Sequence, residues 1–128
     1  EELEKKHVSW WNLKFFIGLA YRKLGVFHQA IQYFNKVLAI KENQIDTLAE
    51  LGICYAGLGE LQKAIKTFHQ AIEVEENNNE LLCNLAMLYL EIGNIEKAKE
   101  YINTSLKMNP QDEITISCKK EIDAIARN

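Results

Sequence analysis

A spacing of 34 residues runs through this chain and limits its fold more than any other feature. Gly25, Gly59 and Gly93 are separated by this spacing. Two further columns keep the same register, namely Tyr21, Tyr55 and Tyr89, and Ala30, Ala64 and Ala98. A repeat of this length is typical of a solenoid, in which one unit of a few helices is copied and stacked on its neighbours.

Each copy is predicted to contain two helices. Apolar residues recur at intervals of three and four from Leu48 to Leu58 and again from Leu61 to Ile72, which is the helical period. Gly59 lies between the two runs, where glycine can adopt a left-handed turn at low cost. The period therefore divides the chain into three repeats: residues 11–44, 45–78 and 79–112.

Small residues recur at one place on the predicted first helices. Gly18, Gly52 and Ala86 share this column, although glycine in a helix costs up to about 1 kcal/mol relative to alanine. The cost is understandable if a neighbouring helix passes too close for a side chain. We therefore expect close helix packing at this column, and also at the alanine column of the second helices.

The two ends of the chain lie outside the three repeats. Residues 1–10 are expected to extend the first helix backwards. Residues 113–128 are expected to form a capping helix on the last repeat, because they carry an apolar stripe at helical spacing. The stripe consists of Ile114, Cys118, Ile122 and Ile125.

The middle repeat carries a recognisable motif. It reads large–x–x–Leu–Gly–x–x–Tyr, then a later alanine followed by an aromatic residue, at Leu48, Leu51, Gly52, Tyr55, Gly59, Ala64, Phe68 and Ala71. This motif resembles the tetratricopeptide repeat, although Lys14 and Ile102 depart from it in the outer copies. The resemblance implies an all-α fold, a right-handed α-solenoid of three helix-turn-helix repeats with a C-terminal capping helix.

The same resemblance implies that the first helices line a concave groove in which a ligand lies. By column, the candidate groove residues are Asn12, Phe15, Phe16, Leu19, Asp46, Ala49, Glu50, Ile53, Glu80, Cys83, Asn84 and Met87. The middle of this set is apolar and one side is acidic, and a large uncovered apolar patch usually marks a contact. Two alternatives stay open: Leu19, Ile53 and Met87 pack between helices, or the face mediates self-association.

One known ligand class of this family can be tested by residue. Repeats that grip the acidic C-terminal tails of cytosolic heat-shock chaperones use a clamp of lysines, asparagines and an arginine. The matching places here are Phe15, Leu19, Glu50, Glu80 and Asn84. They hold neither lysine nor arginine, and two of them are acidic, so we expect such a tail to be repelled.

The sequence contains no recognisable arrangement for catalysis, metal binding or a cofactor. His7, His28 and His69 fall in different columns, without cysteine or carboxylate at ligand spacing, and are interpreted as surface residues. No nucleophile elbow, phosphate loop or zinc-protease motif occurs. We therefore expect a protein that is not an enzyme and that holds neither metal nor cofactor.

Net charge, the length of the apolar stretches and the cysteines argue against further classes of protein and partner. A net charge of −3 without a basic stripe argues against nucleic acid as a partner. The longest apolar stretch, residues 15–20, is far shorter than the ~20 residues of a membrane span. Cys54, Cys83 and Cys118 form no C-x-x-C pair, so we expect reduced, mostly buried thiols and a cytoplasmic location.

These observations predict a non-catalytic protein–protein interaction module or scaffold, which binds an apolar or amphipathic peptide segment of a protein partner in its groove. One alternative is a structural spacer within a longer repeat protein, whose groove holds its own flanking chain. Trp10 and Trp11 at the open front end favour the spacer. Others are a small secretion or assembly chaperone, and an enzyme subunit whose chemistry lies elsewhere in the parent chain.

Overall fold

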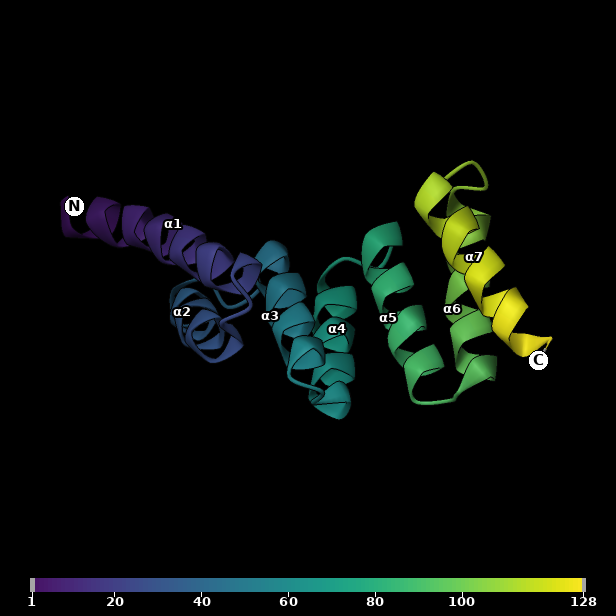
Figure 1. Ribbon diagram of the computed structural model, residues 1–128. Helices are drawn as coiled ribbons and strands as arrows, with labels where there is room; N and C mark the ends of the chain where they lie inside the picture. The colour runs from purple at the N-terminus through teal and green to yellow at the C-terminus, as the bar shows by residue number, and fades with distance from the viewer. Residues whose placement is uncertain (1, 128) are drawn as a thin grey trace. The chain divides into compact units, whose positions relative to one another are not determined.

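The computed structural model describes the backbone of residues 2–127 and the side chains of residues 10–127. All regular structure in this part is helical (Figure 1). The helices are α1 (Glu2–Lys23), α2 (Phe27–Ile40), α3 (Ile45–Gly57), α4 (Leu61–Val74), α5 (Asn79–Glu91), α6 (Ile95–Met108) and α7 (Glu113–Ala126). The predicted all-α class of helical repeats is confirmed.

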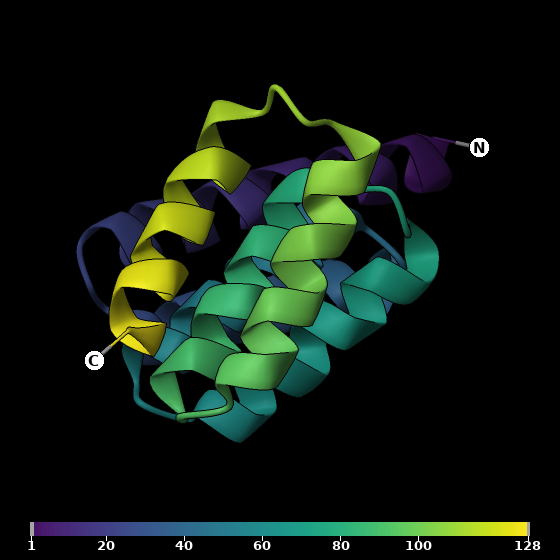
Figure 2. The same cartoon turned by 90° about the vertical axis from the view of Figure 1, so that its right-hand side faces the viewer.

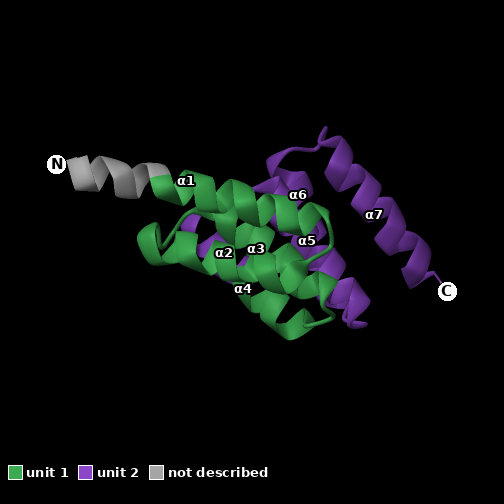
Figure 3. Cartoon of the chain, turned by 60° about the vertical axis from the view of Figure 1, so that its left-hand side comes forward, with its two compact units in different colours: residues 1–67 green, residues 68–128 purple. Residues whose placement is uncertain are grey.

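The chain forms two compact units, residues 1–67 and residues 68–128, coloured green and purple in Figure 3. In unit 1, α2 packs against both α1 and α3. In unit 2, α6 packs against both α5 and α7, and α7 also contacts α5. Figure 2 shows α6 and α7 running in opposite directions from the loop that joins them. Each unit therefore has helices that cover one another's apolar faces.

The first helix of each repeat ends in the same hydrogen-bonded turn. The φ angles of Gly25, Gly59 and Gly93 are +78°, +78° and +85°, in the left-handed region that favours glycine. The next residue donates its backbone N–H to the carbonyl of the tyrosine column: Val26 to Tyr21 at 2.9 Å, Glu60 to Tyr55 at 2.9 Å and Asn94 to Tyr89 at 2.8 Å. This is the bond of a Schellman turn, which ends a helix.

Side chains at one column also set where α3, α5 and α7 begin. The caps are Gln44, Asn78 and Asp112, which accept a hydrogen bond from the backbone N–H of Thr47 at 2.7 Å, Leu81 at 3.0 Å and Thr115 at 2.9 Å. Such a cap satisfies an N–H that the helix itself leaves without a partner. The bonds to Thr115 also lower the pKa of Asp112, because they favour its charged form.

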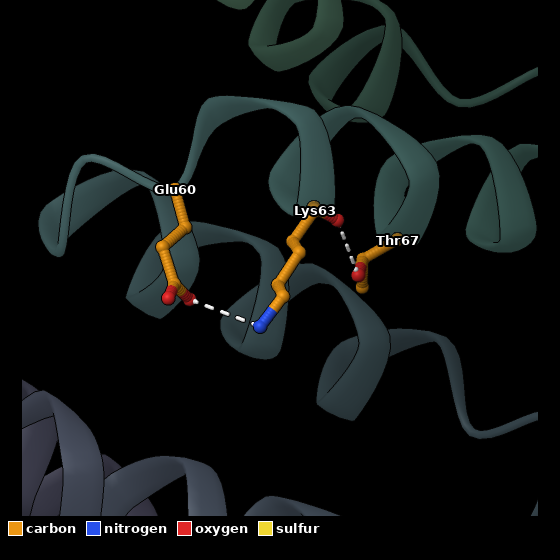
Figure 4. Close-up of polar contacts among 3 residues, drawn as sticks. All are labelled: Glu60, Lys63 and Thr67. Carbon is orange, nitrogen blue, oxygen red and sulfur yellow. Dashed lines mark hydrogen bonds and ion pairs between the residues drawn. The ribbon is translucent and has the colours of Figure 1, made fainter.

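Helix α4 carries a short chain of polar contacts (Figure 4). The Thr67 hydroxyl donates to the carbonyl of Lys63 at 2.8 Å, so this buried hydroxyl is satisfied within its own helix. The Lys63 ammonium lies 3.7 Å from the Glu60 carboxylate and 5.7 Å from the centre of the Tyr55 ring. Because the ion pair is exposed, it contributes less than about 1 kcal/mol.

The core of unit 1 depends on a close approach between α1 and α2. A Cβ atom added to Gly18 would lie only 2.6 Å from Cε1 of Phe34. Phe34 is fully buried and clusters with Leu51 and Cys54 of α3. The ring of Phe34 therefore occupies the space that a side chain on α1 would need, which explains the glycine in that column.

Helix α7 does not bury the stripe predicted from its sequence. Ile122 is 1% exposed, but Ile114 and Ile125 are 60% and 45% exposed. The interface instead includes Thr115, which is fully buried and lies with its hydroxyl 2.9 Å from the Ser105 hydroxyl of α6. The predicted stripe is thus wrong at Ile114 and Ile125, because α7 turns Thr115 and Ile122 towards the core of unit 2.

Replacing Gly18 by leucine separates helix propensity from packing. Propensity alone predicts a gain of about 1 kcal/mol, because leucine is a better helix former than glycine. The ring of Phe34 leaves no room for the new side chain, so we expect a net loss of about 1–3 kcal/mol in the free energy of unfolding. Urea denaturation measures this difference.

Ala20→Leu is the matched control, because Ala20 is exposed on the same helix. Its free energy of unfolding should change by less than about 0.5 kcal/mol. A Gly18→Leu variant that is as stable as the parent protein would show that the two helices do not approach closely.

The burial of α7 predicts unequal effects for two isoleucines on one helix. Ile122→Ala should lower the free energy of unfolding by about 2–5 kcal/mol, because it leaves a cavity in the core. Ile125→Ala should change it by less than about 1 kcal/mol, because this side chain is largely in solvent. Equal losses in thermal or urea unfolding would contradict this orientation of α7.

Candidate peptide-binding surface

Unit 1 carries the predicted groove residues of the first two repeats. They are Asn12, Phe15, Phe16 and Leu19 on α1, and Asp46, Ala49, Glu50 and Ile53 on α3. Three of them, Asn12, Phe16 and Asp46, are exposed, and the others are partly buried. The candidate surface of unit 1 therefore combines half-buried apolar side chains with exposed residues on both helices.

The apolar part of this surface is also part of the core. Phe15 and Leu19 pack against the buried cluster around Phe34, and the Phe15 and Phe34 rings lie 5.8 Å apart. Phe16 is 64% exposed, and its ring meets the edge of Phe15 at a centroid distance of 5.9 Å. Phe15 and Leu19 thus hold the helices together on one side and stay partly accessible on the other.

Glu50 does not form the acidic rim that the sequence predicted. Its carboxylate pairs with the guanidinium of Arg22, which joins α3 to α1. The two side chains are only 20% and 25% exposed, so the pair is largely shielded from water. The prediction is wrong here because the charge is matched inside unit 1. Asp46, by contrast, is exposed in the first turn of α3, so this helix still presents one acidic side chain at the surface there.

The cysteines are poorly suited to nucleophilic chemistry. The pKa of Cys54 is raised to about 11, mainly by burial and also by the negative charge of Glu50, while Arg22 acts in the opposite direction. The pKa of Cys118 is also raised to about 11, mainly by burial and further by the neighbouring Cys83. Because the reactive form of cysteine is the thiolate, both thiols are protonated and unreactive near neutral pH.

Unit 2 places the groove residues of the third repeat differently. Cys83 is 3% exposed and belongs to a core cluster that includes Ile122 of α7. Its Sγ atom lies 3.4 Å from the Thr115 hydroxyl, also on α7. The prediction that Cys83 faces a ligand is therefore wrong, because α7 covers it. Of the others, Met87 and Asn84 are partly buried and Glu80 is exposed.

A pair of stacked tyrosines in each unit was missed by the sequence analysis. The rings of Tyr21 and Tyr33 lie 5.8 Å apart at an angle of 24°, and those of Tyr89 and Tyr101 lie 5.6 Å apart at 7°. Both pairs occupy the same two columns of the repeat, and Thr67 replaces the second tyrosine in the middle copy. The sequence therefore contains a second column that holds tyrosine in the first and third repeats, and this column could have predicted the two pairs.

His69 is part of this aromatic packing in unit 2, so the interpretation of a surface histidine is wrong. Its Nε2 atom lies 3.1 Å from the Tyr89 hydroxyl, and its ring lies 5.9 Å from that of Tyr101. Burial lowers the pKa of His69, the positive charge of Lys97 lowers it further, and Glu73 opposes the shift. The cluster therefore favours the neutral imidazole.

Other kinds of site have little support in the described part of the chain. No group of three or more histidine, cysteine, aspartate or glutamate side chains is placed to hold a metal ion among residues 10–127. Within the described helices, none is long and apolar enough to cross a membrane. A depression in unit 2 offers only uncharged groups, from Asn77, Asn79, Met108 and Asn109.

Paired helices that share glycine turns, side-chain caps and close-packed small residues define a protein of the tetratricopeptide class. The family described as "Psidin, N-terminal TPR repeats region" matches residues 1–116, and the chain belongs to this family. The resemblance seen in the sequence is therefore confirmed. No curated protein sequence matches the chain.

Several solved structures share this fold. The first TPR of Spaghetti (RPAP3), bound to the HSP90 peptide SRMEEVD, has a TM-score of 0.82 at 14% identity and covers 92% of this chain and 94% of that chain. PcrH in complex with the chaperone binding region of PopD has a TM-score of 0.81 at 13% identity, with coverage of 91% and 90%. YrrB, described as having an unusual peptide-binding site, has a TM-score of 0.79 at 24% identity, with coverage of 86% and 57%. At these identities the likeness establishes the fold alone.

Protonation of His69 should lower the stability of the protein in mild acid. Its folded-state pKa lies below the usual 6.5, so the unfolded chain takes up the proton first as the pH falls. The contribution of neutral His69 to the free energy of unfolding is complete above the pKa of the unfolded state. It is lost as the pH falls through the pKa of the folded state. His69→Gln removes the titration, so its melting temperature should depend less on pH between about 7.5 and 5 than that of the parent protein.

His28→Gln provides the control, because His28 is exposed on α2 and lies outside the aromatic cluster. This variant should keep the pH dependence of the parent protein. If acidification lowers the melting temperature of His69→Gln by as much as that of the parent protein, His69 does not contribute to the pH dependence.

Proposed function

We propose that the chain is a non-catalytic interaction module that binds an apolar or amphipathic segment of a partner protein along α1 and α3. One observation carries this proposal: Phe15, Leu19 and Ile53 stay partly accessible on these first helices, whereas the core residues of α2 are fully buried. The first helices therefore have apolar surface to offer a ligand.

An apolar ligand face suits this surface better than a polar one. Burial of apolar area contributes roughly 25 cal/mol per Å², and Phe16, at 64% exposure, adds area next to Phe15. An amphipathic helix can place its apolar face on such side chains while its other face stays in water. In unit 2, taken by itself, Met87 of α5 also stays partly accessible, and we propose it as an apolar contact that this unit can offer to a ligand.

The charges of unit 1 set a preference at the edge of the surface. Because Glu50 is paired with Arg22, the exposed carboxylate that α3 offers near its beginning is Asp46. A lysine or arginine on the flank of the ligand would complement Asp46. Exposed charges of this kind mainly influence the association rate, and salt weakens their effect.

An acidic C-terminal tail fits the chain poorly as a ligand. The peptide held by the Spaghetti domain contains two glutamates and an aspartate. At the places where related repeats use basic side chains, this chain has Phe15, Leu19, Glu50, Glu80 and Asn84. We therefore propose an apolar or amphipathic ligand instead, because neither lysine nor arginine stands at these places to pair with a carboxylate.

Ile53→Glu tests the apolar part of the proposed surface. A peptide is first selected for binding from a library of amphipathic helices, and its affinity is then measured by titration calorimetry. We expect the variant to lose on the order of 2 kcal/mol, about 30-fold in Kd, because a charge would replace an apolar contact. Circular dichroism should show an unchanged helix content.

Two further variants serve as controls. Ile40→Glu places the same charge at an exposed apolar position on α2 and should leave the Kd within about twofold. Asp46→Lys should slow association, and this effect should disappear at high salt. A selected peptide that binds Ile53→Glu as tightly as the parent protein would contradict the proposed site.

A further inference from the structure

Two cysteines of unit 2 lie together where α7 packs against α5. Cys83 of α5 is 3% exposed and belongs to a buried cluster, and Cys118 of α7 packs against the same cluster. Thr115, one turn before Cys118 on α7, places its hydroxyl 3.4 Å from the Sγ atom of Cys83. Since residues three apart lie on the same side of a helix, the side of α7 that carries Cys118 is the side that contacts Cys83.

The two thiols also contact each other. Burial is the main cause that raises the pKa of Cys118, and a side-chain hydrogen bond with Cys83 is another, so the two sulfur atoms are neighbours. A disulfide requires Cβ atoms about 3.5–4.5 Å apart and Cα atoms within about 7 Å. Because the thiols already meet between two packed helices, we expect rotation of their side chains to bring the sulfur atoms to bonding distance.

The three cysteines of the chain differ in access and in possible partners. Cys118 is partly exposed, whereas Cys83 is buried. A small reagent therefore reaches Cys118 first, and Cys83 is accessible mainly to a sulfur atom that is already inside the cluster. Cys54 is buried in unit 1 and is the only cysteine among residues 1–67, so its own unit offers it no second thiol.

We propose that Cys83 and Cys118 form a reversible disulfide that locks α7 onto α5, with a small aliphatic disulfide as the oxidant. The Cys118 thiolate attacks one sulfur atom of the oxidant, whose S–S bond breaks and releases one small thiolate. The Cys83 thiolate then attacks the Sγ atom of Cys118 and releases the second small thiolate. The two cysteines lose two electrons, which reduce the oxidant to two thiols, and their two protons pass to these thiols.

The bond would change how easily α7 leaves the rest of unit 2. This helix is anchored by the buried Thr115 and Ile122, while Ile114 and Ile125 are largely in solvent. Opening of a single helix costs less free energy than unfolding of the whole unit, and a covalent link between α5 and α7 prevents the two from separating. The oxidised chain therefore keeps Cys83 covered, whereas the reduced chain uncovers it whenever α7 opens.

Mass spectrometry after oxidation tests the pairing. The full chain is incubated with excess glutathione disulfide at a pH of about 9, because the raised pKa of Cys118 leaves little thiolate near neutral pH. The remaining thiols are alkylated in denaturant before digestion with trypsin. We expect a covalent link between the peptides of Cys83 and Cys118 and alkylation of Cys54 alone. Cleavage after lysine and arginine places the three cysteines in separate peptides, residues 42–63, 67–97 and 108–119.

Hydrogen exchange tests whether the bond locks the helix. The backbone amides of α7 should exchange at least about tenfold more slowly in the oxidised chain than in the reduced chain, and a reducing agent should restore the faster exchange. Cys118→Ser is the matched control, because it removes one thiol from a partly exposed position. After the same oxidation it should exchange like its own reduced form. Cys54→Ser should form the link as the parent protein does.

The proposal is overturned by any of three results. Cys83 and Cys118 could both be alkylated after oxidation, Cys54 could replace either of them in the link, or the linked chain could exchange the amides of α7 as fast as the reduced chain. The parent protein alone decides all three results, so a variant that fails to fold does not affect them.

Discussion

The ring of Phe34 lies against Gly18 so closely that no side chain fits between α1 and α2. This contact sets the position of the apolar residues around it. Phe15 and Leu19, on the turns of α1 next to Gly18, pack against the same cluster and remain partly accessible. The surface proposed for a ligand is therefore the outer part of the core itself. Because Phe15 and Leu19 already pack against this cluster, we expect them to lose little side-chain entropy when a ligand binds.

Polar contacts decide how much of the first helices stays accessible. In unit 1 the pairing of Arg22 with Glu50 ties α1 to α3 and removes a negative charge from the rim. In unit 2 the Thr115 hydroxyl of α7 lies close to Cys83 of α5 and to Ser105 of α6, and Cys83 is buried beneath α7. Cys83 and Phe15 occupy the same column of the repeat. One column thus has two environments, according to whether another helix covers it.

A repeat protein buries apolar area mainly between neighbouring copies. The face that α3 and α7 each bury under a preceding second helix is open on α1, where Leu13 is 59% exposed. An open apolar face costs solubility unless something covers it. Leu13 of α1 therefore lacks the cover that its counterparts Thr47 and Thr115 have.

Features that depend on local conformation or on the 34-residue period could be predicted from the amino-acid sequence. Gly59 predicted a helix end because only glycine takes a left-handed φ cheaply, and the structure gives it a φ of +78°. The 34-residue columns predicted the family and the helical class, because each repeat must match its neighbour to stack. Gly18 predicted a close approach before its neighbour Phe34 was known.

Which side chains those helices cover depends instead on contacts between helices. Ile114 and Thr115 are adjacent, yet the apolar one is exposed and the polar one buried, because the hydroxyl has a partner on α6. Likewise, Glu50 forms an ion pair with Arg22 of another helix, and the His69 ring lies within hydrogen-bond distance of the Tyr89 hydroxyl. Such contacts join residues far apart in the chain, and their stabilisation depends on distance and burial, which no pattern along a single helix contains.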